Sequence, residues 1–152
     1  MRPSVEEQLL GTCRILEKVI CPCVVDQYAL TILQGLIANL RMLSSAVPGV
    51  AGFLRSDNLA TAVLLGQLQA GCCGALAESI ALALVKPEPD ATDTQALDQR
   101  NGELRELLSQ ALGEPKLTPS MRAAALTHMS ARASAAPMRY VSTSSPSPKK
   151  AS

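Results

Sequence analysis

The cysteines are the residues whose types and spacing come closest to a chemical site. Cys21 and Cys23 flank a proline in ICPCVV, and Cys72 and Cys73 are adjacent in AGCCGA. A structural zinc site needs four ligands, commonly in pairs two to four residues apart. The first pair suits a turn, but helix neighbours point about 100° apart, so Cys72 and Cys73 do not converge readily on one ion. The spacing therefore disfavours a metal site.

A redox role has equally little support, because no C-x-x-C motif follows a strand. Cys13 lies on an apolar helix stripe, and free cysteine behaves as a small hydrophobe in protein cores. Five cysteines without an export signal are typical of reduced thiols, so we expect a cytoplasmic protein. We predict packing as the role of the thiols, and neither a metal nor another cofactor.

Polar side chains beside apolar helix faces are the other candidates. They either pair between helices and set the register, which we favour, or line a ligand-binding cleft. This candidate set is Asn39, Arg41, Arg55, Asp57 and Asn58, and Glu78 is a further candidate for lining a pocket. Glu78 lies in an apolar run, where burial would raise its pKa, but we expect it to face the polar side of its helix.

Catalytic motifs are missing from the sequence. It contains no glycine-rich phosphate loop after a strand, no H-E-x-x-H and no G-x-S-x-G. His128 is the single histidine, and we expect it to be solvated or to cap a helix. We assign no catalytic residue and regard an enzyme as the less favoured interpretation.

The composition predicts an all-α fold. The 152 residues are 47% hydrophobic but only 2% aromatic, and leucine and alanine favour helix. The net charge of +1 gives no long-range attraction to nucleic acid. We expect one domain, residues 1–141, forming an antiparallel bundle of four to six helices, with a disordered tail over 142–152.

Helix boundaries are marked by caps and prolines. We predict a first helix from the Ser4–Glu7 capping box to Pro22, and a second from Asp26 to Pro48-Gly49. On the second helix we expect a wide buried face and outward-facing polar side chains. The buried face comprises Tyr28, Ile32, Leu33, Leu36, Ile37, Leu40 and Leu43, and the outward-facing residues are Gln34, Asn39 and Arg41.

The second half of the chain should hold two or three further helices. Residues 50–85 form one helix or two joined near Gly71–Gly74, and 86–94 form a mobile loop. Further helices are predicted over 93–112, before Gly113, and from Thr118-Pro119 onward. Asn58 and Asn101 each precede a Leu-Leu pair by the same offset, but leucine-rich helices give such echoes by chance.

A membrane-spanning hairpin is the structural alternative. Residues 59–85 carry one charge, Glu78, and are long enough to span a bilayer. The run also contains Gln67, Gln69 and Ser79, and neither aromatic belts nor clusters of Lys and Arg flank it. We therefore predict a buried core helix and regard a membrane association as the weaker hypothesis.

Four segments resemble a family of small helical bacterial proteins of unknown function. They are RPSVEEQL (2–9), LIANLRML (36–43), FLRSDN (53–58) and PMRY (137–140). The resemblance covers residues 2–141 and implies an association with aminoglycoside-phosphotransferase-like kinases and acyl-CoA dehydrogenases. It brings no assigned catalytic residues. It also implies that Met138, Tyr140 and Val141 dock on the bundle.

The hypothesis with most support is a non-enzymatic accessory protein in acyl-CoA or related catabolic metabolism. It would form a homodimer or bind a metabolic enzyme, such as an acyl-CoA dehydrogenase or a phosphotransferase-like kinase. The alternative is a protein that binds an acyl or CoA-type small molecule between its helices.

Overall fold

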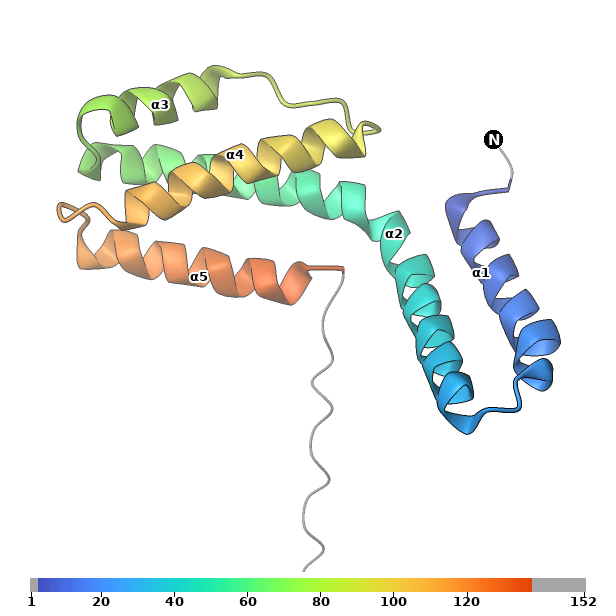
Figure 1. Cartoon of the computed structure of the whole chain (residues 1–152). Helices are drawn as coiled ribbons and strands as arrows, with labels where there is room; N and C mark the ends of the chain where they lie inside the picture. Colours follow the sequence, from blue (N-terminus) through green and yellow to red (C-terminus); the bar gives the residue numbers. More distant parts are fainter. Residues whose placement is uncertain (1–2, 138–152) are drawn as a thin grey trace, which may run out of the picture.

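The computed structural model describes residues 3–137, and this part of the chain is all-α, as predicted (Figure 1). The expectations for Met138, Tyr140, Val141 and the tail lie outside the described residues. The helices are α1 (Val5–Ile15), α2 (Gln27–Leu68), α3 (Gly74–Val85), α4 (Thr94–Leu112) and α5 (Pro119–Ala135).

The predicted helix starts are confirmed by side-chain caps. Ser4 Oγ accepts a hydrogen bond from the Glu7 N–H at 3.2 Å, and the Glu7 carboxylate accepts from the Ser4 N–H at 2.7 Å. The N-caps of α2, α4 and α5 are Asp26, Asp93 and Thr118, each bonded to the N–H three residues later. These caps satisfy backbone donors that a helix cannot satisfy internally.

The predicted end of the second helix at Pro48-Gly49 is wrong, because α2 continues through Pro48 for 42 residues in all. A proline inside a helix removes one N–H donor and crowds the preceding turn. Pro48 itself is exposed, and the carbonyl that loses its partner is that of Ser44, which is only 3% exposed. Burial of Ala46 before the proline and Leu54 after it holds both halves in place. Figure 1 shows α2 changing direction between the two halves.

The stretch 50–85 is divided between two helices, which was one of the two alternatives that the sequence left open. A 3₁₀ turn over Gln69–Gly71 ends α2, and α3 starts at Gly74 with a φ of +57° that favours glycine. A Cβ placed on Gly71 would lie 2.8 Å from Leu117 Cδ2. Glycine therefore lets the segment before α5 pack closely against this joint.

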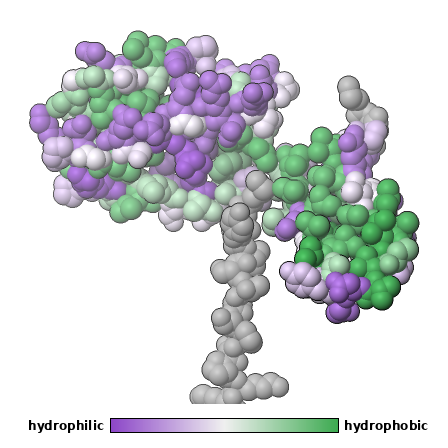
Figure 2. All heavy atoms as spheres, in the orientation of Figure 1, coloured by the Kyte–Doolittle hydropathy of each residue, from purple (hydrophilic) through white to green (hydrophobic). Residues whose placement is uncertain are grey.

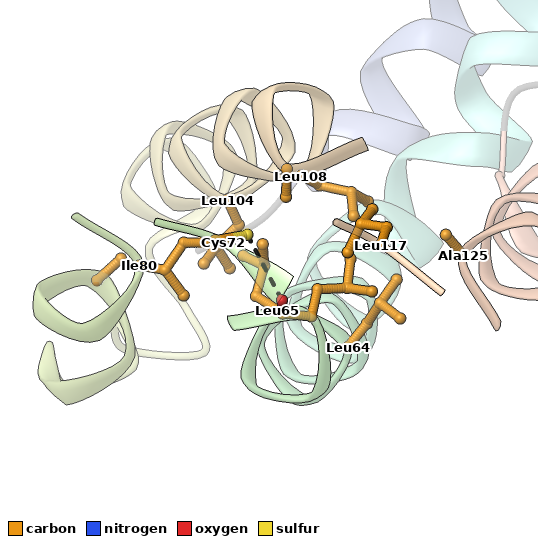
Figure 3. Close-up of a cluster of buried hydrophobic side chains, with 11 residues drawn as sticks. Leu64, Leu65, Cys72, Ile80, Leu104, Leu108, Leu117 and Ala125 are labelled. Carbon is orange, nitrogen blue, oxygen red and sulfur yellow. Dashed lines mark hydrogen bonds between the residues drawn. The ribbon is translucent and has the colours of Figure 1, made fainter. Parts of the chain in front are cut away.

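The second half of α2 forms a four-helix bundle with α3, α4 and α5. Consecutive helices run antiparallel, so α2 and α4 run in the same direction side by side (Figure 1). Their leucines meet Ile80 of α3 and Ala125 of α5 in one core (Figure 3). The fully buried members of that core are Leu65, Leu68, Ile80, Leu104 and Ala111, each with no exposed area.

The first half of α2 packs instead on α1, forming a two-helix hairpin that projects from the bundle (Figure 1). A π-helical turn, Leu16–Ile20, and a 3₁₀ turn, Cys21–Cys23, carry the chain from α1 toward α2. Cys13 is buried in the hairpin, with its Sγ 3.8 Å from the Ile37 carbonyl oxygen, which confirms its packing role.

The predicted wide buried face of the second helix is only partly correct. Ile37 is buried and Leu33 and Leu40 are half-buried, because they face α1. The other four members are exposed: Tyr28, Ile32, Leu36 and Leu43. No second layer of helices covers this side of the hairpin within residues 3–137, so a single partner helix buries one stripe and leaves the other in solvent.

We expect Pro48→Ala to raise the free energy of unfolding by about 1 kcal/mol or more, because alanine restores the missing donor in a helix interior. Urea denaturation measures the change, with Gln67→Ala, an exposed substitution later in α2, as the control. A lower unfolding free energy in Pro48→Ala would show that the bend itself stabilises the fold.

Candidate functional site

The most distinctive site is a buried polar network inside the bundle. Its members come from α2 (Asp57, Asn58, Thr61), α4 (Asn101) and α5 (His128, Arg132). Asp57 is only 5% exposed, and Asn58 and Thr61 are fully buried. Buried polar groups are costly unless each finds a partner, so the contacts of these side chains determine whether the bundle is stable.

The Asp57 carboxylate is the centre of the network. Its Oδ2 accepts hydrogen bonds from Asn101 Nδ2 and Arg132 Nε, both at 2.7 Å. Arg132 also donates from Nη2 to Asn101 Oδ1 at 3.3 Å, and its guanidinium lies 5.7 Å from the centre of the Phe53 ring. A buried carboxylate held by an arginine and an amide is satisfied in charge and in hydrogen bonding.

Asn58 extends the network to the loop between α3 and α4. Its Oδ1 accepts from Asn101 Nδ2 at 2.9 Å, and its Nδ2 donates to the Leu97 carbonyl oxygen at 3.1 Å and to Glu88 Oε1 at 3.4 Å. Asn58 and Asn101, which form the sequence echo, therefore pair directly across the two parallel helices. Glu88 ties part of the predicted mobile loop to the bundle.

The expectation that His128 is solvated or capping is wrong, because its side chain is only 12% exposed. Its Nε2 lies 3.0 Å from Thr61 Oγ1 and 3.9 Å from Asp57 Oδ1. In a nucleophilic triad, one ring nitrogen of the histidine contacts an accessible hydroxyl and the opposite ring nitrogen contacts the carboxylate. Here one nitrogen faces both groups and Thr61 is fully buried, so the geometry links helices and does not expose the Thr61 hydroxyl as a nucleophile.

Arg100 of α4 is a buried cation beside the C-terminal end of α3. Its Nη2 donates to the Ala83 carbonyl oxygen at 2.6 Å, and Nη1 lies 3.8 Å from the Glu103 carboxylate, which also binds Lys86 Nζ at 3.0 Å. Cations are favourable near a helix C-terminus, where carbonyl groups lack partners. Arg100 Nε and Nη1 have no hydrogen-bond partner among the described residues.

Two adjoining clefts border the network. The larger, about 590 Å³, has apolar walls from Val50, Phe53 and Leu54 and lies beside Asn101 and Arg132. The other, about 400 Å³, is lined by His128 and by apolar side chains of α4 and α5. Arg105 and Arg132 line both clefts, and Arg105 has no ion-pair or hydrogen-bond partner within the described range. The larger cleft is also lined by the carboxylate of Asp98, so it offers both an unpaired cation and a carboxylate beside its apolar wall.

The sequence-predicted site residues do not form one site. Asp57 and Asn58 lie together in the network, whereas Arg41 pairs at 2.6 Å with Glu17 of the π-helical turn after α1. Arg55 and Glu78 are exposed, as expected for Glu78, and neither makes an ion pair or a hydrogen bond in the part of the chain that is described. The structure thus supports the favoured interpretation of pairing between helices for Arg41, Asp57 and Asn58.

Sequence reasoning missed the partners of Asp57. Asn101 and Arg132 lie 44 and 75 residues further along the chain. The echo of Asn58 and Asn101, each before a pair of leucines, was a signal for Asn101. No local pattern marks Arg132, because its role depends on how α5 crosses α2.

The predicted packing role of the thiols is confirmed for the buried Cys13 and Cys72 and is wrong for Cys23 and Cys73, which are exposed. Burial, with Glu114 and Cys73 adding to it, raises the pKa of the Cys72 thiol. Lys116 Nζ lies 3.2 Å from the exposed Cys73 Sγ, and this contact raises the pKa of the Lys116 amine. Over residues 3–137, no three side chains of His, Cys, Asp or Glu are grouped so that they could hold a metal ion.

The helix that passes a length and composition test for a membrane span is Gln27–Gly71, α2 with the turn that follows it. Its most apolar window is only 17% buried within the protein. The run 59–85, where the sequence placed the membrane alternative, is divided between α2 and α3 and contributes Leu64, Leu65, Leu68 and Ile80 to the core.

We expect Asp57→Ala to lower the free energy of unfolding by about 3 kcal/mol, because it leaves Arg132 without its carboxylate and opens the α2–α4 pairing. Asp98→Ala, on an exposed side chain of α4, should change the unfolding free energy by no more than about 0.5 kcal/mol. Equal effects of the two substitutions in urea denaturation would contradict a supporting role for the network.

The rate of thiol labelling should differ between exposed and buried cysteines, and the raised pKa of Cys72 should slow its labelling further. Iodoacetamide, followed by mass spectrometry, should modify Cys23 and Cys73 first, because the thiolate is the reactive form and both are exposed. Cys13 and Cys72 should react at a comparable rate only after unfolding in urea. Rapid labelling of Cys72 in the folded protein would show that the joint before α3 opens.

Comparisons with family models, with curated proteins and with solved structures find no match to this chain.

Proposed function

We propose that this chain is a non-enzymatic interaction protein whose docking element is the α1–α2 hairpin. The observation that carries the proposal is the exposure of large apolar side chains on that hairpin. Tyr28 is 75% exposed, Ile15 58% and Leu36 53%. Contiguous apolar surface of this kind marks sites that another surface covers.

The hairpin and the bundle differ in how they treat apolar groups. Figure 2 shows a dense apolar surface over the hairpin, whereas the visible face of the bundle is mixed and largely polar. The bundle has four helices to enclose its leucines, but the hairpin has two. A two-helix element cannot enclose a core, so its second apolar face is available for another molecule.

The resemblance in four segments supports a metabolic context for this interaction. It implies a partner such as an acyl-CoA dehydrogenase or an aminoglycoside-phosphotransferase-like kinase, in the cytoplasm and in acyl-CoA or related catabolic metabolism. A second copy of the chain is the other partner that the proposal admits. In each case a neutral helix face is the docking surface, because residues 27–40 contain no charged side chain.

A second candidate function is favoured by the larger cleft. Its apolar wall and the unpaired Arg105 suit a small organic anion, including the acyl or CoA-type ligand that the sequence suggested. Arg105→Ala should then release a co-purifying small molecule without affecting protein partners.

The docking role is tested by capture of the tagged, full-length chain from native lysate and mass spectrometry of the recovered proteins and small molecules. A stoichiometric dehydrogenase, kinase or untagged copy should be recovered, and Leu36→Glu should reduce recovery by about tenfold or more, since a charge replaces an apolar contact. Leu126→Glu, on an exposed leucine of α5, is the matched control.

Two results would count against this role. One is a partner whose recovery depends on Leu126 and not on Leu36, which would place the docking surface on α5. The other is the recovery of a small molecule alone, lost in Arg105→Ala, which would establish the second candidate.

A further inference from the structure

We propose that the hairpin face binds a second copy of this chain, forming a four-helix interface around a two-fold axis close to Asn39. This inference rests on the proposed function, because it names the partner of the same docking element. It is carried by the position of the exposed side chains on the two helices and by Asn39, the one polar side chain in the heptad stripe of α2.

The exposed apolar side chains lie on one face, which on α1 is interrupted by the exposed polar residues Gln8 and Thr12. On α1 and the turn after it the apolar members are Val5, Ile15 and Val19, and on α2 they are Ile32, Leu36, Leu43 and Val47. On both helices this exposed stripe runs one residue position before the stripe that is buried between the helices. One position corresponds to about 100° of rotation around the helix axis. For antiparallel neighbours the same offset turns both stripes to one side of the hairpin.

The opposite side of the hairpin is polar. It carries Arg14 and Lys18 on the α1 side, and Gln34 and Arg41 on α2, with Arg41 held by Glu17. The hairpin is therefore amphipathic as a unit, with one mostly apolar face two helices wide. Such a face matches half of a four-helix bundle, in which a second hairpin supplies the other half.

The apolar stripe of α2 has the spacing of a helix–helix seam. Ala29, Ile32, Leu36, Asn39 and Leu43 follow one another at intervals of three and four residues, which is the heptad pattern of packed helix pairs. All five are exposed. The regular spacing predicts a helical partner that runs along α2.

Asn39 identifies that partner as a second copy. It is exposed at the middle of the seam, and its side chain makes no hydrogen bond within residues 3–137. An asparagine amide both donates and accepts, so it pairs with its own counterpart across a two-fold axis. A single asparagine in an apolar seam is a known means of selecting register and oligomeric state. A different partner would need a matching polar group placed opposite Asn39.

The dimensions of the face are sufficient for a specific dimer. A helix of about 20 residues is about 30 Å long, and two packed helices are about 20 Å wide. The face would therefore bury about 600 Å² on each copy, or about 1,200 Å² in total, the lower end of the range for stable interfaces. Neither copy brings a charge into the middle of the seam, because residues 27–40 are uncharged.

Light scattering on the purified full-length chain tests the inference directly. The wild-type protein should have twice the 16.0 kDa mass of one chain, and the fraction of dimer should fall on dilution. Leu36→Glu should weaken the dimer roughly 30-fold, whereas Leu126→Glu should leave it unchanged. Circular dichroism checks that both variants keep their helices, as expected because neither leucine belongs to the bundle core.

The charge-swap pair Asn39→Asp and Asn39→Lys tests the two-fold axis itself. Each variant alone should be mainly monomeric, because identical charges meet at the axis. An equimolar mixture should regain the dimer mass, because each dimer then joins opposite charges. Only self-pairing at Asn39 predicts this recovery, whereas a structural role of Asn39 within one chain does not.

Three results would overturn the inference in distinguishable ways. A monomer that captures an enzyme through Leu36 would refute the second copy and leave the docking role intact. A monomer that captures no protein and binds neutral phosphatidylcholine vesicles through Leu36 would refute both and assign the face to a lipid surface. A dimer insensitive to Leu36→Glu, or a charge-swap mixture that stays monomeric, would place the axis elsewhere.

Discussion

The buried carboxylate of Asp57 is the constraint on which the rest of the bundle depends. A carboxylate that is 5% exposed requires donors, and Asn101 and Arg132 supply them from two other helices. Since those donors are fixed to α4 and α5, satisfying Asp57 determines how both helices lie against α2. Leucine packing alone would tolerate small shifts between helices, whereas this network specifies one arrangement.

The network also explains why the clefts beside it are structured. Arg132 is held by Asp57 and Asn101, so it cannot turn freely into the cleft that it lines. Arg105, which lines the same clefts, has no such partner among the described residues. Of the two arginines, Arg105 is therefore the cation available to a ligand, and Arg132 is the support that keeps the apolar wall in position.

The hairpin, unlike the bundle, leaves much of its apolar surface uncovered. Its helix α2 continues into the bundle, but its apolar residues have one neighbouring helix in place of three. The same sequence signal, leucine and isoleucine at helical spacing, therefore leads to a closed core beyond Pro48 and to an open face before it. Burial depends on how many elements surround a helix, and the pattern on one helix does not contain that number.

Local chemistry in the sequence determined where helices begin, why the chain is all-α and why Cys13 packs, because caps, helix propensity and spacing act over a few residues. Only the tertiary structure decided that α2 passes through Pro48, that Tyr28 and Leu36 are exposed, and that His128 lies against Thr61. It also decided which polar residues meet: Asp57 and Arg132 are 75 residues apart, and Arg41 pairs elsewhere. These outcomes depend on contacts between distant segments, whose energies appear only when the helices are packed together.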